Sequence, residues 1–259
     1  GRGVDLNNDV IAASGTVSMS GQHNTGATYA ISLSGSTSIT AGTGVTLESL
    51  NNNTGTIALL SSGGIDGGSG TVLMRAANYA FGGADRTITT TGVLTIEPDA
   101  DENSFASSFD NQYLNPVSVT GLTLGKSSNA SAITLSRAIS LSGPVSIYGG
   151  SIDVNANITA NSGNILLDAD TGSTLNQSST GILLDDAITI ETVTSGNLTL
   201  IGRSGDTGSG FDGIDASSAN TTTLRSAGNL TLQGYSYAAS GSGRGVDLNN
   251  DVIAASGTV

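Results

Sequence analysis

Short runs of alternating apolar and polar residues recur along the chain, and ten of them follow a glycine. In each run the apolar residues lie two positions apart, which places them on one face of an extended strand. A glycine before such a run suits a tight turn. The pattern therefore predicts many short strands separated by turns. The ten runs are GTVSM (15–19), GVTLE (44–48), GTIAL (55–59), GTVLM (70–74), GVLTI (92–96), GLTLG (121–125), GPVSI (143–147), GNILL (163–167), GNLTL (196–200) and GNLTL (228–232).

The segment GSIDVNANITANSGNILLDA (150–169) shows how three such runs combine. Its apolar pairs are separated by polar corners, and the opening stretch of the chain has the same spacing. Three inward pairs in succession predict three strands in each turn of a parallel β-helix. The predicted inward pairs are Ile152 with Val154, Ile158 with Ala160 and Ile165 with Leu167, and, in the opening stretch, Val4 with Leu6, Val10 with Ala12 and Val17 with Met19.

One turn of three strands, called a coil below, cannot bury its apolar face alone, whereas stacked coils share a continuous core. The glycine spacing indicates roughly 22–27 residues per coil. We therefore expect an all-β chain folded as a right-handed parallel β-helix. Asparagines at the corners suit left-handed backbone geometry and stacked side-chain ladders. The corner candidates are Asn7, Asn8, Asn155, Asn157 and Asn161.

A longer repeat contains these coils. The stretch GRGVDLNNDVIAASGTV occupies residues 1–17 and appears again, letter for letter, at residues 243–259. Residues 1–242 are therefore interpreted as one tandem repeat, and residues 243–259 as the start of the next identical repeat. Each repeat is expected to hold roughly 8–12 coils.

The segment 97–119 (EPDADENSFASSFDNQYLNPVSV) breaks the coil pattern. Phe105, Phe109 and Tyr113 are spaced as one face of a helix, after an acidic start that suits a helix N-terminus. We predict that a short amphipathic helix or a structured loop leaves the coil here. The three rings are candidates for contact with another fibre, a glycan or a host protein. The alternative is that they lie on the coils and cover an apolar seam.

Composition excludes several classes of protein. The chain has 8 Lys and Arg against 21 Asp and Glu, and a net charge of −13, which is opposite to the basic surface that nucleic acids require. It has no Cys, so disulfides and thiolate chemistry are excluded. Its apolar runs are shorter than the roughly 18 residues of a membrane helix, so membrane insertion is not expected.

Catalysis and metal binding have few candidate residues. His23 is the single histidine and lies in a polar turn, so we expect no catalytic residues and no enzyme. The Gly/Asp-rich loop 204–215 contains Asp206, Asp212 and Asp215, whose oxygens are candidates for calcium. This loop lacks the spacing of an established calcium motif, and plain turns are the alternative. No other cofactor is expected.

Two stretches resemble a known family. GGSIDVNANITANSGNILLDA (149–169) and GVDLNNDVIAASGTVSMSG (3–21) resemble the coil repeats of filamentous-haemagglutinin-type secreted adhesins of bacteria. The resemblance implies export to the cell surface or the extracellular space, a fibrous shape and a role in attachment. It implies partners in the form of further copies along the fibre axis, neighbouring fibres, glycans or cell surfaces.

These observations predict a structural and adhesive repeat of a long extracellular bacterial fibre, acting as a stiff stalk or filament. The rival hypothesis is a glycan-binding or polysaccharide-processing β-helix. Such a protein would need acidic residues aligned across neighbouring coils, beside basic partners and aromatic platforms. The acidic candidates are Asp153, Asp168, Asp170, Asp185 and Asp186.

Overall fold

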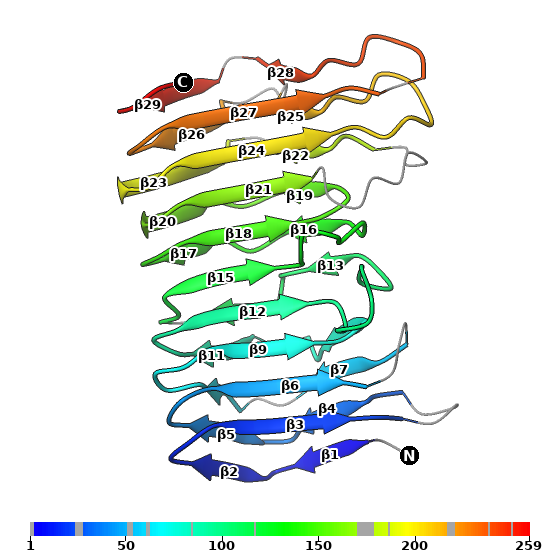
Figure 1. Cartoon of the computed structure of the whole chain (residues 1–259), viewed down its shortest axis with the longest axis vertical. Coiled ribbons are helices and arrows are strands. Elements are labelled where there is room, and N and C mark those ends of the chain that lie inside the picture. Colours follow the sequence, from blue (N-terminus) through cyan, green and yellow to red (C-terminus); the bar gives the residue numbers. More distant parts are fainter. Residues whose placement is uncertain are drawn as a thin grey trace. The chain divides into compact units, whose positions relative to one another are not determined.

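A computed structural model describes residues 3–23, 28–50, 54–60, 63–83, 85–116, 118–169, 179–185, 187–216, 221–237, 239–249 and 251–259. Within these residues the chain is all-β, with 29 strands and no helix. The structure divides into two units, residues 1–126 and residues 127–259. In each unit the strands form parallel sheets, and neighbouring strands of a sheet lie three places apart in the order of the chain (Figure 1).

Unit 1 contains β1 to β15. One sheet has the order β1 (Val4–Asn7), β4 (Ile31–Ser34), β7 (Thr56–Leu59), β10 (Asn78–Phe81). The second has the order β2 (Val10–Ala13), β5 (Ser38–Ala41), β8 (Ile65–Asp66), β11 (Arg86–Thr89), β14 (Leu114–Pro116). The third has the order β3 (Val17–Gly21), β6 (Val45–Ser49), β9 (Val72–Arg75), β12 (Val93–Glu97), β15 (Gly121–Leu124). The fifth coil begins with β13 (Phe109–Asp110).

Unit 2 contains β16 to β29. Its first group has the order β16 (Ile133–Leu135), β19 (Ile152–Val154), β22 (Ile182–Leu184), β25 (Ile214–Ala216), β28 (Val246–Leu248). The second has the order β17 (Ile139–Leu141), β20 (Ile158–Ser162), β23 (Thr189–Ser195), β26 (Thr223–Ser226), β29 (Val252–Ala255). The third has the order β18 (Val145–Tyr148), β21 (Ile165–Ala169), β24 (Leu198–Arg203), β27 (Leu230–Tyr235).

This arrangement confirms the predicted parallel β-helix, and in each unit the coil winds in a right-handed sense (Figure 1). Strands β1 to β27 form nine coils of three strands, five in unit 1 and four in unit 2. Strand β28 begins at Val246, which is the equivalent of Val4, where β1 begins. Nine coils therefore fill residues 1–242, and both the number of coils and their mean length lie within the predicted ranges.

The glycine-anchored runs correspond to one particular strand of each coil. Nine of the ten lie at the third strand, from β3 to β27, and the exception, GTIAL (55–59), forms β7. The glycines of this corner allow the backbones of adjacent coils to approach closely. Gly163 and Gly196 have φ angles of 121° and 113°, and a Cβ on Gly196 would lie 1.9 Å from the Gly163 carbonyl oxygen. A side chain at this corner would therefore push the coils apart.

The core consists of aliphatic side chains that stack from coil to coil. In unit 2, Ile147, Leu167 and Leu200 are adjacent in the ladder and fully buried. The pairs predicted for the segment 150–169 point inward as expected: all six residues are buried. Alternation of inward and outward residues along each strand therefore determines which side chains form this core.

One predicted inward pair is wrong. Val10 is 75% exposed, and its neighbour Ile11 faces inward, in register with the buried Ile39. The preceding corner is one residue longer than the corresponding corner of segment 150–169, and it contains Asn8 in a left-handed conformation with φ 60°. Because side chains alternate along a strand, this one extra residue exchanges the inward and outward faces of β2.

A ladder of asparagines connects the corners of unit 2. The Asn197 N–H donates to the Asn164 Oδ1 at 2.8 Å, and the Asn229 N–H donates to the Asn197 Oδ1 at 2.9 Å. The Asn157 Oδ1 similarly accepts from the Thr189 N–H at 2.8 Å. Stacked corner asparagines were predicted, and Asn157 is one of the predicted residues; the continuous ladder uses other positions. Each amide oxygen here satisfies a backbone donor of the following coil.

Removing a stacked core side chain should destabilise the chain locally. We expect Ile190→Ala in β23 to lower the free energy of unfolding by about 2–5 kcal/mol, because Ile190 is fully buried. Val193 lies on the same strand and is 48% exposed. We expect Val193→Ala to change the free energy of unfolding by less than about 0.5 kcal/mol. Urea denaturation of both variants measures the difference, and equal losses would contradict this assignment of the core face.

Candidate functional site

The described residues of the segment 97–119, which omit residue 117, form no helix. Residues 98–108 are an irregular loop, followed by the short strands β13 and β14. The loop is held to the preceding coil, since the Ala106 N–H donates to the Ala77 carbonyl at 2.8 Å. A helix is therefore wrong for this segment: residues 98–108 form a loop, whereas β13 and β14 are strands of the fifth coil. Phe105 and Phe109 have helical spacing in the sequence, but both rings pack against β10 and the backbone between them is not helical.

The rings of Phe105 and Phe109 stack on each other, with centroids 5.6 Å apart and an interplanar angle of 25°. The ring of Tyr79 meets both edge-on, at 5.8 Å and 5.7 Å. Phe81 meets Phe109 edge-on at 6.1 Å. Offset and edge-to-face contacts are the arrangements that aromatic rings prefer. These residues come from β10 and, one coil later, from the loop and β13. Tyr79 and Phe81 are in register with the buried Ile57 and Leu59. The rings of Phe105 and Phe109 therefore pack against the inward column of β10.

Tyr79 anchors this cluster through its hydroxyl group. The hydroxyl donates toward the carbonyl oxygens of Met74, at 2.8 Å, and Glu97, at 2.9 Å. Burial raises the pKa of Tyr79 well above its ordinary value, and the nearby charge of Glu97 adds to this effect. The phenol therefore stays neutral and continues to donate throughout the physiological pH range.

All three rings predicted as contact residues line one cavity, called the aromatic pocket below. Its volume is about 230 Å³. Phe105 and Phe109 are each only 4% exposed and form its buried wall, while Tyr113 is half-buried at its margin. The polar lining residues are Asn78, Ser107, Ser108, Asp110 and Gln112. The pocket thus combines aromatic surface with hydrogen-bonding groups, but it is smaller than most cavities that bind drug-sized ligands.

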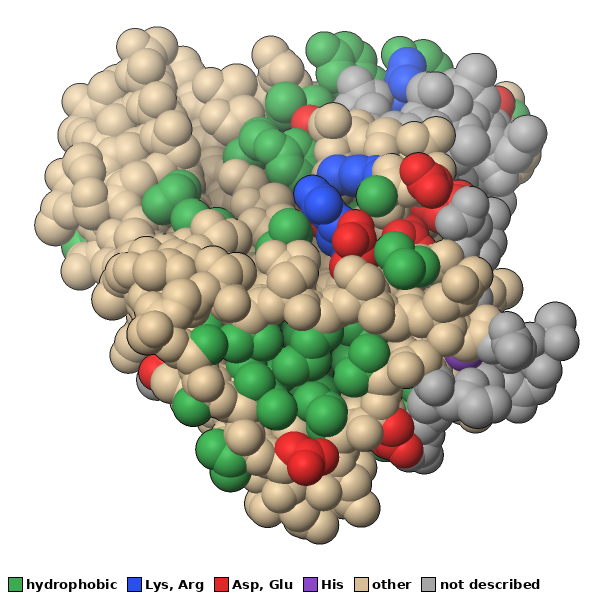
Figure 2. Space-filling model, turned by 60° about the horizontal axis from the view of Figure 1, so that its bottom comes forward, with side chains coloured by type: hydrophobic (Ala, Val, Ile, Leu, Met, Phe, Trp, Pro, Cys, Tyr) green, Lys and Arg blue, Asp and Glu red, His purple; other side chains and the backbone are tan. Residues whose placement is uncertain are grey.

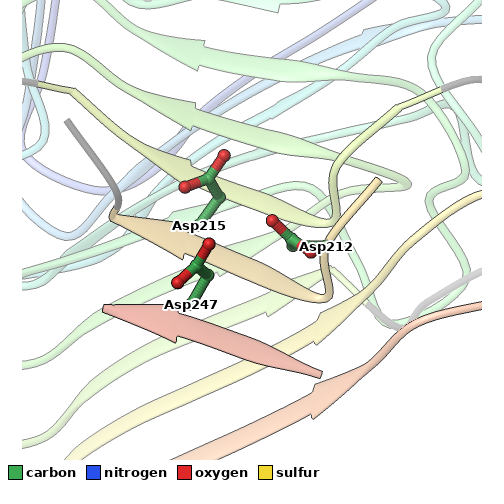
Figure 3. Close-up of side chains that lie close together, drawn as sticks. All are labelled: Asp212, Asp215 and Asp247. Atoms are coloured by element: carbon green, nitrogen blue, oxygen red, sulfur yellow. The ribbon is translucent and has the colours of Figure 1, made fainter. Parts of the chain in front are cut away.

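A second group of side chains, the acidic cluster, consists of Asp212, Asp215 and Asp247. One carboxylate oxygen from each lies within 4.8 Å of the others. Asp215 and Asp247 are opposite each other in the parallel ladder of β25 and β28, and Asp212 precedes β25 (Figure 3). Like charges placed opposite each other on neighbouring strands repel. This cluster therefore concentrates negative charge at the coil that carries β28.

Arg244 offsets part of this charge. Its backbone N–H donates to the Asp212 Oδ1, and its guanidinium group donates to the Asp247 Oδ2. Asp212 is only 6% exposed. Burial raises the pKa of the Asp212 carboxyl, the hydrogen bond from Arg244 opposes this, and the charges of Asp215 and Asp247 raise it further. The folded chain thus favours the protonated form of Asp212 more than the unfolded chain does.

The predicted calcium ligands are only partly brought together. Asp212 and Asp215 belong to the acidic cluster, and Asp206 does not. Asp247 is the third member, and sequence spacing could not identify it because it is contributed by the following coil. Calcium takes six to eight oxygen ligands, whereas this cluster offers three carboxylates and Arg244 already binds two of them. The arrangement favours a charge cluster compensated by arginine over a calcium site.

The rival hypothesis of polysaccharide processing needs acidic residues aligned across neighbouring coils. The acidic candidates that lie within the described residues are not aligned in this way. Asp153 faces Leu183 of the next coil in the ladder, and Asp168 faces Ile201. Asp185 is exposed, and Asp170 and Asp186 lie outside the described residues. The described members of this set therefore form no row of carboxylates across neighbouring coils.

No family model, curated protein or solved structure matches the chain. Within the described residues there is no helix with the length and apolar character needed to cross a membrane.

The raised pKa of Asp212 makes stability depend on pH in a defined direction. A folded pKa above the unfolded value means that the folded chain gains stability as the pH falls from neutral toward the ordinary Asp value of about 4. Asp212→Asn removes this titration but retains a side-chain oxygen for the Arg244 N–H. We expect the free energy of unfolding of the unsubstituted chain to rise relative to Asp212→Asn upon acidification.

Urea denaturation between neutral pH and about pH 4 measures this difference. The chain carrying Asp110→Asn, at an exposed position, is the control for loss of one negative charge. A difference between the unsubstituted chain and Asp212→Asn that stays constant, or that falls upon acidification, would contradict the inferred burial of charge at this cluster.

Proposed function

We propose that this chain is a structural and adhesive repeat of a long extracellular or cell-surface bacterial fibre, in which successive copies extend one stalk or filament. The observation that carries the proposal is the agreement between the two periods. The long repeat equals a whole number of coils, nine, and the next copy begins with the same strand of the coil. Copies of such a repeat can follow one another without any change in strand order.

Coil energetics support the same function. In a stack of coils, each coil interacts with its neighbours, so stability grows by a similar increment with each added coil. Length can therefore increase through duplication of whole repeats, while the core stays the same. A low content of Lys and Arg and a net charge of −13 keep such a long surface self-repelling and soluble.

Electron microscopy of chains with different numbers of copies tests this function. Parallel strands stack at about 4.8 Å, so nine coils add about 43 Å for each repeat. We expect chains with one and with three copies to form thin particles whose lengths differ by about 86 Å, twice that increment. Native material should show the same axial repeat. Globular particles, or lengths that do not grow with copy number, would contradict the fibre.

A second candidate function, binding of a glycan, is favoured by the aromatic pocket. Sugar rings present apolar C–H faces and a rim of hydroxyl groups. The pocket offers the half-buried Tyr113 at its margin, with Asn78, Asp110 and Gln112 around it. A volume of about 230 Å³ suits one ring of a longer chain more than an extended oligosaccharide. This function is compatible with the fibre, because the pocket lies within unit 1 and its lining residues Ser107, Ser108, Asp110 and Gln112 are exposed.

Binding to an oligosaccharide array tests the second candidate. We expect Tyr113→Ala to weaken binding of any captured glycan by up to about tenfold, through loss of aromatic contact. Tyr235→Ala is the matched control, because Tyr235 lies on β27 of unit 2, 44% exposed and outside the pocket. Equal effects of both substitutions, or no glycan captured by the unsubstituted chain, would count against the pocket as a glycan site.

A further inference from the structure

The first coil of unit 1, β1 to β3, has one covered side and one bare side. Each of its strands pairs with the strand of the second coil and ends its ladder. The inward residues Leu6, Ile11 and Met19 are only half-buried, whereas their partners Leu33, Ile39 and Leu47 are at most 3% exposed. Figure 2 looks toward this end of unit 1 and shows hydrophobic side chains gathered within the outline of the coil. The bare side is thus an apolar surface formed by terminal strands, which soluble proteins normally cover.

The stretch of residues 1–17 is present a second time as residues 243–259, called the junction segment below. In the first coil this stretch pairs with the coil that follows it, whereas the junction segment pairs with the coil that precedes it. Strand β28 pairs with β25 and strand β29 with β26. The Ile214 N–H donates to the Gly245 carbonyl at 2.9 Å, and the Leu230 N–H donates to the Thr258 carbonyl at 2.8 Å. The junction segment therefore continues the ladders of the ninth coil, β25 to β27.

The two copies fold alike. Strand β29 spans the same letters as β2, VIAA, and β28 begins at the valine equivalent to Val4. In both copies the isoleucine of the second strand faces inward, Ile11 toward Ile39 and Ile253 toward Leu224. The corner also repeats: the Asn7 N–H donates to Asp9 at 2.7 Å, and the Asn249 N–H donates to Asp251 at 3.0 Å. The fold of this stretch is thus the same whether the neighbouring coil lies after it or before it.

We infer that the bare side of the first coil is an interface for a second copy of this repeat, and that the ninth coil of that copy covers it through the contacts made here by the junction segment. Superposing the two copies of the stretch places Ile11 between Leu224 of one repeat and Ile39 of the next. Val4 then lies between Ile214 and Ile31. The inward stacks of the first and second strands become continuous, and a coil that is half-covered in each copy becomes covered on both sides.

The acidic cluster lies at the junction, and its residues come from two successive repeats. Asp212 and Asp215 belong to the preceding repeat, while Arg244 and Asp247 are the equivalents of Arg2 and Asp5. The acidic cluster with its arginine is therefore completed only where two repeats meet. The asparagine ladder also crosses this boundary, since the Thr258 N–H donates to the Asn229 Oδ1 at 2.9 Å, and Thr258 is equivalent to Thr16. Both features bring the incoming segment into one register.

Hydrogen exchange on the full chain tests this interface, which rests on the proposed function only in taking repeats to follow one another. We expect Ile253→Asp to release the junction segment, because it buries a charge in the inward stack. The amides of Ile214 and Leu230 should then exchange at least about tenfold faster. Val252→Asp is the matched control, because Val252 is the neighbouring residue and 45% exposed. It should leave both amides protected.

Rescue in trans then tests recognition of another copy. The free peptide of residues 1–17 is added to the full chain carrying Ile253→Asp, and we expect it to restore protection of Ile214 and Leu230. The same peptide carrying Ile11→Asp should fail, and the peptide carrying Val10→Asp should succeed. Exchange of core amides of unit 2, such as that of Ile165, reports whether the substituted chain remains folded. If the substituted chain is unfolded, the remaining test is the unsubstituted chain, in which we expect slow exchange of the Ile214 and Leu230 amides.

Two results would overturn the interface. One is fast exchange of Ile214 and Leu230 in the unsubstituted chain, and the other is failure of the unsubstituted peptide to restore protection in a folded chain. Neither result bears on the axial repeat that electron microscopy would measure. A fibre with the expected repeat and no peptide rescue would keep the proposed function and reject this interface. Rescue by the peptide, with no growth in length upon addition of copies, would do the opposite.

Discussion

Hydrogen bonding between strands one coil apart is the constraint on which the rest of this structure depends. The backbone donors and acceptors of a strand pair with strands of adjacent coils. No described strand is therefore hydrogen-bonded to the strand that directly precedes or follows it in the chain. Inward side chains must therefore stack in register, which explains the columns of Ile, Leu and Val. Corner residues must also allow coils to approach, which explains the glycines at 163 and 196 and the asparagine ladder that begins at Asn164.

The same constraint creates an unfinished surface wherever the stack of coils stops. A terminal coil has apolar side chains covered on one side only, as the half-buried Ile11 and Ile253 illustrate. Folded chains manage the edges of terminal strands by covering them. Residues 243–259 cover the ninth coil, and they have the same sequence as residues 1–17, which form the first coil. The acidic cluster shows that this cover also involves charge, since Arg244 binds Asp212 and Asp247 where the two copies adjoin.

The aromatic loop of unit 1 illustrates how tertiary contacts determine local structure. Phe105 and Phe109 have helical spacing, yet both rings are buried against Tyr79, which lies on the preceding coil. An isolated helical turn would gain little from its own hydrogen bonds, whereas burying two phenylalanine rings gains several times more. The two rings therefore pack against the inward column of β10, and the pocket beside them is formed by residues from two coils.

The sequence alone determined the inward face of the third strand of each coil, the class of fold and the range of coil number, because alternation and glycine spacing are local properties of the chain. It also located three residues of the aromatic pocket. Only the tertiary structure decided features that depend on distance between coils. One extra corner residue exchanged Val10 for Ile11 on the inward face of β2, and hydrogen-bonded register brought Asp247 to Asp212 and Asp215 while leaving Asp206 outside. The physical reason is that parallel pairing joins residues about one coil apart, and the length of each corner sets which residues meet.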